Sequence, residues 1–131
     1  MREILFRGKR IEDGQWVEGH YHFANWYLPP SMEIVDRTHH ILQIGRGDAD
    51  KIDPDTLGQF TGLTDKNGKK IFEGDICKHR SNYSGEYVIS VVTYTDGQFL
   101  AMADNNSGFN LSDKLEVIGN IHDNPELLEG E

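Results

Sequence analysis

Residues 57–76, LGQFTGLTDKNGKKIFEGDI, constrain the fold of this chain more than any other stretch. Two apolar segments flank the polar run DKNG, and Asn-Gly between extended segments is the strongest short-range indication of a β-hairpin. Asn67 and Gly68 both tolerate a positive φ, which the favoured two-residue hairpin turn requires. A second turn, EGD at residues 73–75, leads directly into the next apolar segment. The stretch predicts a β-rich fold, and it contains no catalytic or cofactor signature.

Length and charge limit the class of protein. At 131 residues the chain is long enough for one domain with a core of ordinary size. Its 13 basic and 22 acidic side chains give a net charge of −9. That balance argues against nucleic-acid binding, because such proteins usually need a positive surface. No apolar run is long enough to cross a bilayer, so we expect no membrane partner.

Cys77 is the only cysteine, which rules out an internal disulfide and a cysteine-based zinc site. The N-terminus lacks the apolar core of a signal peptide, so we expect an intracellular protein. A nucleophilic thiol needs an electropositive, partly exposed setting, and His79 would share the face of Cys77 on a strand. We favour a structural role instead, because free cysteine is among the most buried residue types.

The spacing of apolar residues predicts short strands on both sides of a polar loop at residues 45–55. The expected strands are 3–8, 15–23 and 40–44, followed by 57–63, 70–79, 87–94, 98–103 and 115–121. Asp96-Gly97 indicates a second tight hairpin. The β-branched run at 88–92 predicts a central strand that is covered on both faces. Pro125 predicts one closing helical turn.

Five short strands joined by tight hairpins favour a small barrel, which would also remove exposed sheet edges. We therefore expect a mainly β fold in which residues 1–131 form a single compact unit. Within it, residues 1–56 would be a β-rich extension and residues 57–128 the barrel core. The acidic residues 129–131 would be a frayed tail.

Three sequence blocks resemble the YopX-like family of bacteriophage and prophage proteins. They are REILFR at 2–7 with the following Trp16-Val17, QFTGLTDKNG at 59–68 with IFEGDI at 71–76, and EVIGNIHDNPELL at 116–128. The resemblance implies an SH3-like barrel and a protein of the cytoplasm of an infected or lysogenic bacterium. It implies no cofactor, and it provides no catalytic residue to transfer to this chain. Small barrels serve many unrelated roles, so the fold alone assigns no function.

Glu18, His20 and His22 form the best candidate for a metal site. Alternate residues of a strand point to the same face, so two imidazoles and a carboxylate could share one ion. His39 and His40 could approach the same ion from elsewhere in the chain. The alternative is a solvated strand face, because a lone His-x-His lacks the ligand spacing of established metal motifs.

Asp48, Asp50, Asp53 and Asp55 bring several carboxylates into one loop, which is what Ca²⁺ prefers. Counted from Asp48, however, Asp53 occupies the position of the required glycine. Gln59 occupies that of the closing glutamate. We favour an exposed polar loop over a calcium site.

Trp26, Tyr27, Pro29 and Pro30 are the candidate partner-binding residues. Large aromatic side chains lie beside two prolines here, in a segment that we expect to be an irregular loop rather than a core strand. If exposed together, these residues would require a protein partner or a second copy of the chain.

The sequence favours a non-enzymatic accessory protein of a phage or prophage that acts as a protein-binding or assembly module. We expect a homo-oligomer or a complex with a phage or host protein, with no cofactor. One alternative is a metal-binding protein or metal-dependent hydrolase that uses His20 and His22. A second alternative is a small barrel that binds nucleic acid through aromatic side chains and basic loops.

Overall fold

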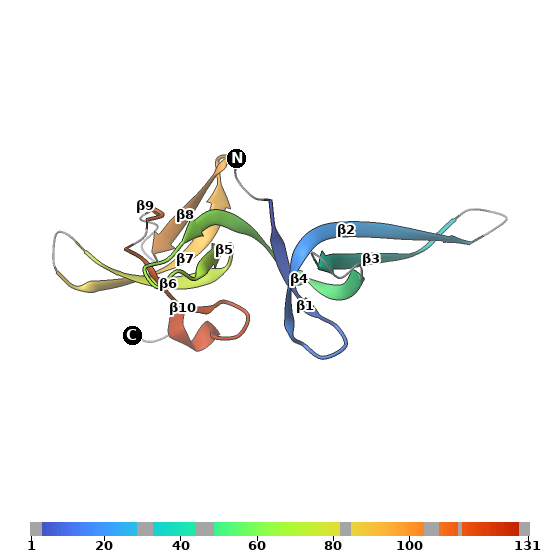
Figure 1. Ribbon diagram of the computed structural model, residues 1–131, viewed down its shortest axis with the longest axis horizontal. Coiled ribbons are helices and arrows are strands. Elements are labelled where there is room, and N and C mark those ends of the chain that lie inside the picture. Colours follow the sequence, from blue (N-terminus) through green and yellow to red (C-terminus); the bar gives the residue numbers. More distant parts are fainter. Residues whose placement is uncertain are drawn as a thin grey trace. The chain divides into compact units, whose positions relative to one another are not determined.

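The computed structural model of the protein describes residues 4–28, 33–43, 49–81, 85–103, 108–112 and 114–128. Its elements in these residues are β1 (Phe6–Arg10), β2 (Trp16–Leu28), β3 (Glu33–Gln43), β4 (Ala49–Thr64), β5 (Lys70–Phe72), β6 (Asp75–Arg80), β7 (Tyr87–Thr95), β8 (Gln98–Ala103), β9 (Gly108–Asn110), β10 (Glu116–Asn120) and the short 3-10 helix η1 (Pro125–Leu128) (Figure 1). The prediction of a mainly β protein is confirmed. Over the described ranges, the structure contains no helix with the length and apolarity needed to cross a membrane.

The chain forms two compact units. The N-terminal unit ends at Gln59 and the C-terminal unit begins at Phe60, so β4 contributes to both. The expectation of one compact unit, with an extension at 1–56 and a barrel core at 57–128, stays a prediction.

Strand pairing in the N-terminal unit closes on itself. β2 pairs antiparallel with β1 and β3, and β4 pairs antiparallel with β3 and, further along, with β1. Val17, Ile41 and Ile52 from three of these strands form its buried core. Gly19 of β2 lies so close to β3 that a Cβ built on it would be 2.0 Å from the Leu42 carbonyl oxygen. The ring of strands therefore depends on a residue without a side chain at this crossing.

A bulge explains how Pro54 is accommodated inside β4. The partner of β1 changes from Gly58 to Asp53 between Arg7 and Lys9, which leaves the residues around Pro54 outside the ladder. Thr56 fills the gap, since its Oγ1 accepts a hydrogen bond from Lys9 N at 2.8 Å. Proline cannot donate to a ladder and is tolerated within strands at such bulges.

The C-terminal unit contains a five-stranded antiparallel sheet in the order β10-β6-β7-β8-β9. Its core consists of Ile71, Cys77, Val92, Ala101 and Leu115. β7 is central, as predicted, and the Asp96-Gly97 hairpin that follows it is confirmed, with φ of 50° and 82°. The sheet is antiparallel like that of the N-terminal unit. A barrel of the SH3-like kind stays a prediction.

The first hairpin is confirmed, but its predicted two-residue turn is wrong. Thr64 of β4 pairs with Lys70 of β5, so the loop spans residues 65–69. Gly68 has φ +82° whereas Asn67 does not have a positive φ. Asp65 causes the difference, because its side chain and backbone bind the loop's N–H groups and open a wider turn.

Several expected boundaries were wrong. The strand expected at 15–23 continues to Leu28, and the one expected at 40–44 begins at Glu33 and ends at Gln43. β4 begins at Ala49, inside the expected loop at 45–55, and the strand expected at 3–8 is Phe6–Arg10. The strand expected at 70–79 is divided by the turn at 73–74, and β9 was not predicted. The closing helical turn is confirmed as η1.

Candidate functional site

The hairpin of β2 and β3 is the most distinctive feature of the N-terminal unit (Figure 1). Its register runs from Gly19↔Gln43 to Leu28↔Glu33. β1 pairs with β2 only as far as Gly19, and β4 reaches only His40 of β3. Residues 23–28 and 33–39, which we call the arm, therefore pair only with each other within the described part of the chain. Six residues of strand give the arm a reach of about 20 Å.

One face at the base of the arm is aromatic. The Tyr21 hydroxyl and His39 Nδ1 share a hydrogen bond of 2.5 Å. The Phe23 ring lies 4.6 Å from the His39 ring between centroids, and the Phe6 ring lies 5.8 Å from that of Tyr21. Phe23 is 42 % exposed, whereas Tyr21 packs against the core. A series of ring contacts therefore leads from the core through His39 to an exposed ring at the point where the arm begins.

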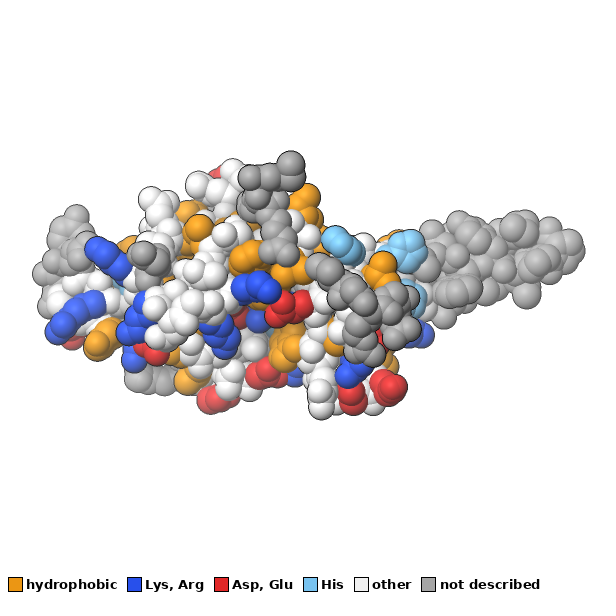
Figure 2. Space-filling model, viewed as in Figure 1, with side chains coloured by type: hydrophobic (Ala, Val, Ile, Leu, Met, Phe, Trp, Pro, Cys, Tyr) orange, Lys and Arg blue, Asp and Glu red, His pale blue; other side chains and the backbone are white. Residues whose placement is uncertain are grey.

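The opposite face at the base carries histidines. His22 is directly opposite His40 in the register, and His20 lies two residues away on the same strand. His20 and His22 are exposed, and histidine side chains gather beside the grey part of the hairpin in Figure 2. Burial, followed by the positive charges of His22, Lys51 and His39, lowers the pKa of His40. Its Nδ1 is buried without a hydrogen-bond partner among the described residues.

The predicted metal ligands Glu18, His20 and His22 do lie on alternate positions of β2, as expected. All three side chains are exposed. Among the residues that the structure describes, no group of three His, Cys, Asp or Glu side chains is arranged to hold a metal ion. The histidines therefore form a polar face without the convergence that a metal site requires.

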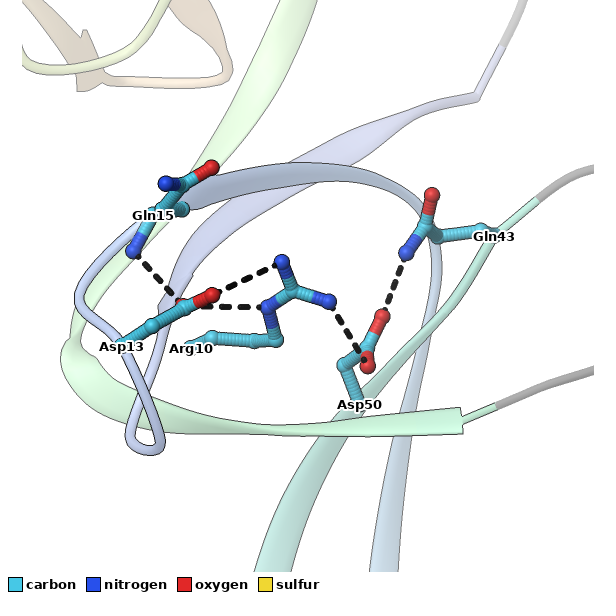
Figure 3. A network of polar contacts seen from close by, with 5 residues as sticks. All are labelled: Arg10, Asp13, Gln15, Gln43 and Asp50. Carbon is cyan, nitrogen blue, oxygen red and sulfur yellow. Dashed lines mark hydrogen bonds and ion pairs between the residues drawn. The ribbon is translucent and has the colours of Figure 1, made fainter.

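A polar network fastens the strands below the arm (Figure 3). The Arg10 guanidinium donates to both carboxylate oxygens of Asp13, at 3.1 and 3.0 Å, and to Asp50 at 3.4 Å. Gln43, at the end of β3, donates to the other oxygen of Asp50. The hydrogen bond from the Gln15 N–H lowers the pKa of the Asp13 carboxyl. Burial acts to raise this pKa, whereas the hydrogen bond and charge of Arg10 lower it further. The network joins β1, β3 and β4, so it fixes the frame from which the arm extends.

Asp50 and Asp53, two of the four carboxylates considered for calcium, have structural roles. Asp50 binds Arg10 and Gln43, as above. The Asp53 carboxylate accepts a hydrogen bond from the Asp55 N–H at 3.0 Å, and its carbonyl accepts one from Thr56 Oγ1. Asp48 lies outside the described residues.

Two of the four candidate partner-binding residues lie near the outer end of the paired strands. Trp26 and Tyr27 belong to β2 and pair in the register with Asp36 and Ile34. The expectation of an irregular loop at these two residues was therefore wrong, because aromatic and β-branched residues favour extended pairing. Their side chains, and all of Pro29 and Pro30, lie outside what the structure describes.

Sequence reasoning named the histidines at the base of the arm, but it missed the extent of the arm, the Tyr21–His39 contact and the Arg10 network. The Tyr21–His39 pair depends on the register of β2 and β3, and the Arg10 network joins β1, β3 and β4. A signal for the hairpin was nevertheless present. Two prolines at 29–30 separate two runs rich in aromatic and β-branched residues, which is the pattern of strands joined by a turn.

Cys77 has the structural role that the sequence favoured. It is fully buried in the core of the C-terminal unit. Burial, assisted by the negative charges of Asp75 and Asp65, raises the pKa of its thiol to about 12. The thiolate needed for nucleophilic chemistry is therefore strongly disfavoured in the folded protein.

Both the sequence and the backbone resemble known proteins. A family model described as YopX protein matches residues 5–129. Protein EF1440 from Enterococcus faecalis is similar at 28% identity, over 98% of this chain and 100% of that chain, with a TM-score of 0.52. Protein yopX from Bacillus subtilis is similar at 20% identity, over 100% of this chain and 99% of that one, with a TM-score of 0.56, and at that identity the likeness concerns the fold alone. No curated protein matches the chain.

Proposed function

The chain belongs to the YopX family, and from this premise we propose that it is a non-enzymatic accessory protein of a phage or prophage that assembles with copies of itself through the arm. The observation that supports the proposal is the arm's pairing, which joins residues 23–28 and 33–39 to each other and to no other described strand. Isolated two-stranded hairpins are marginally stable in water unless a face or an edge is covered. A partner that covers the arm would therefore stabilise it.

A second copy of the chain is the partner that fits best. The two outer edges of the arm present backbone N–H and C=O groups that another strand can pair with. Two identical arms satisfy the requirement of a two-fold interface, in which the same surface serves both subunits. Residues 24–37 contain Glu33, Asp36 and Arg37 as their charged residues. This part of the molecule therefore escapes most of the repulsion that a net charge of −9 creates between copies.

We propose that the contact between copies is made by Trp26, Tyr27, Pro29 and Pro30. We also propose that the C-terminal unit is an SH3-like barrel and that the protein works in the cytoplasm of the bacterial host. Aromatic side chains are enriched at protein interfaces, and strand pairing places two of them on a projecting element. No observation favours the metal or nucleic-acid alternatives for the arm.

The proposal is tested by size-exclusion chromatography with light scattering and elemental analysis of the eluted peak. We expect a defined, metal-free multiple of 14.9 kDa. The double variant Trp26→Ala, Tyr27→Ala should shift the mass toward the monomer. As a control, Tyr94→Ala removes an exposed aromatic side chain of β7, far from the arm in sequence, and should leave the mass unchanged. A monomeric wild type, or a stoichiometric zinc or manganese content, would overturn the proposal.

A further inference from the structure

A cavity of about 250 Å³ opens beside the end of β6 in the C-terminal unit. It is lined by His79, Arg80, Ser81, Phe109, Asn110, Ser112, Lys114 and Leu115. These residues come from β6, from β9 and from the segment that leads into β10. Cavities that bind drug-sized ligands begin at roughly this size, so the space suits a single small molecule.

The charge of the lining is opposite to that of the chain. Among the described residues that line the cavity, the charged ones are Arg80 and Lys114 and none is acidic, although the chain carries a net charge of −9. Arg80 Nε donates to the Gly85 carbonyl at 2.8 Å, which holds the guanidinium in place. Neither cation has an ion-pair partner among the described residues. Lys and Arg side chains also gather over the β6–β7 end of the sheet in Figure 2.

The remaining lining combines an apolar floor with polar groups. Phe109 packs against the core, and Leu115 belongs to it. His79 meets the Phe109 ring edge-on at 4.7 Å between centroids. Its Nδ1 is buried without a hydrogen-bond partner in the described part of the chain. The cavity therefore places an apolar surface beside its polar groups.

We propose that this cavity binds a small organic anion, with its carboxylate or phosphate held by Arg80 and Lys114 and its apolar part placed on Phe109 and Leu115. Two cations that line a partly apolar cavity and have no ion-pair partner among the described residues can form charge-assisted hydrogen bonds to an oxyanion. Ser81, Asn110 and Ser112 supply additional polar groups. The site lies in the other unit from the arm and is independent of the assembly proposal.

Benzoate and phenyl phosphate are suitable probes, because each joins one ring to one of the two oxyanions. We expect either probe to shift the backbone amide resonances of lining residues in a ¹H–¹⁵N spectrum. The probe that binds more tightly identifies the preferred anion. Benzyl alcohol, the uncharged control, should shift them much less. Equal shifts with benzyl alcohol would overturn the proposal. So would the absence of localised shifts at about 10 mM of either anion, a concentration above the largest dissociation constant of interest.

Arg80→Gln and Lys114→Gln should each weaken binding about tenfold, the effect of losing one hydrogen bond to a charged group. Lys66→Gln is the matched control, since it removes the same charge from a side chain that pairs with Glu116 and does not line the cavity. All three side chains are on the surface, and the spectrum of each variant reports whether it is folded. Equal weakening by all three variants would mean that net charge alone attracts the probes, and would contradict the site.

Discussion

Asp65 is the residue on which the sequence block at 59–68 depends. Its carboxylate is 4 % exposed and accepts hydrogen bonds from the N–H groups of Asn67, Lys69 and Val117 at 2.8, 2.9 and 2.9 Å. Burial acts to raise the pKa of Asp65, but these three donors and the charge of Lys69 outweigh it and lower the pKa. One side chain thus holds the first hairpin against β10.

We predict that Asp65→Asn destabilises the C-terminal unit by about 2 kcal/mol, because an amide NH₂ would face an N–H group that needs an acceptor. Urea unfolding followed by far-UV circular dichroism measures the loss. Asp123→Asn is the control, since the contact of Asp123 with Asn120 is exposed, and it should cost much less. Because the pKa of Asp65 is lowered on folding, its carboxylate contributes fully to the free energy of unfolding above about pH 4. This contribution is lost as the pH falls further. Equal effects of the two substitutions would refute this role.

His40 should make the N-terminal unit sensitive to mild acid. Its pKa is lowered on folding from 6.5, so the unfolded chain takes up the proton more readily. The free energy of unfolding is therefore not reduced by protonation of His40 above about pH 6.5. It decreases as the pH falls from there toward the lower pKa that His40 has in the folded state. Both tryptophans, Trp16 and Trp26, belong to the N-terminal unit, so their fluorescence during urea unfolding reports on that unit.

We predict that His40→Gln flattens the dependence of urea stability on pH between about 7 and 5, whereas the exposed His20→Gln leaves it unchanged. The control matters because both side chains are histidines on one face of β2 and β3. An unaltered pH profile in His40→Gln would show that other groups are responsible.

Cys77 provides a third test at the scale of single residues. With the pKa of the thiol raised to about 12 and the side chain fully buried, an aromatic disulfide reagent at pH 8 should not react with the native protein. The same reagent should titrate one thiol per chain in urea. Rapid reaction under native conditions would mean that the thiol is accessible and would reopen a catalytic interpretation.

At the scale of elements, the glycine of the first hairpin fixes the turn. Gly68 has φ +82°, and a Cβ built on it would meet nothing within 4 Å, so only backbone conformation opposes a side chain there. We predict that Gly68→Val destabilises the C-terminal unit by about 1–2 kcal/mol. Asn67→Val, at a neighbouring position of the same turn without positive φ, should cost less. Unchanged thermal stability in Gly68→Val would contradict the turn assignment.

Local chemistry explains which elements were predictable. Asp96-Gly97, Pro125 and the β-branched residues of β7 act over a few positions, and the structure has the elements they indicate. β4 was misjudged because Asp and Pro54 normally indicate a loop, whereas here a bulge absorbs the proline. The arm was underestimated for the opposite reason. The prolines at 29–30 indicate a turn between two strands, but the length over which the strands pair depends on both of them together, and the residues of one strand do not specify it.

The candidate site was predictable only in part. Composition indicated Trp26 and Tyr27 as contact residues, and the strand register places both in the hairpin of β2 and β3. The anion cavity could not be foreseen, because Arg80, Phe109 and Lys114 come from separate elements that the fold brings to one place. The family motifs did not indicate the cavity either. The motif residues Asp65, Gly68 and Asn120 act in turns, as the side chain of Asn120 shows by accepting hydrogen bonds from His122 and Asp123 N–H.

At the scale of the whole molecule, two compact units carry different surfaces. The N-terminal unit presents the arm, whose strands lack partners beyond each other in the described residues, and the C-terminal unit presents a cavity with two cations. Both features are suited to binding. Assembly through the arm is the claim that explains why such a long hairpin is present.

Removing the arm tests that claim most directly. In the shortened chain, Asn-Gly replaces residues 25–37 and joins the directly paired Ala24 and Thr38, a connection suited to a two-residue hairpin. Sedimentation velocity then compares the masses of the wild-type and shortened chains, with circular dichroism confirming that the strands remain. The account predicts an oligomer for the wild type and a folded monomer for the shortened chain. A folded, shortened chain with the same subunit number as the wild type would contradict it.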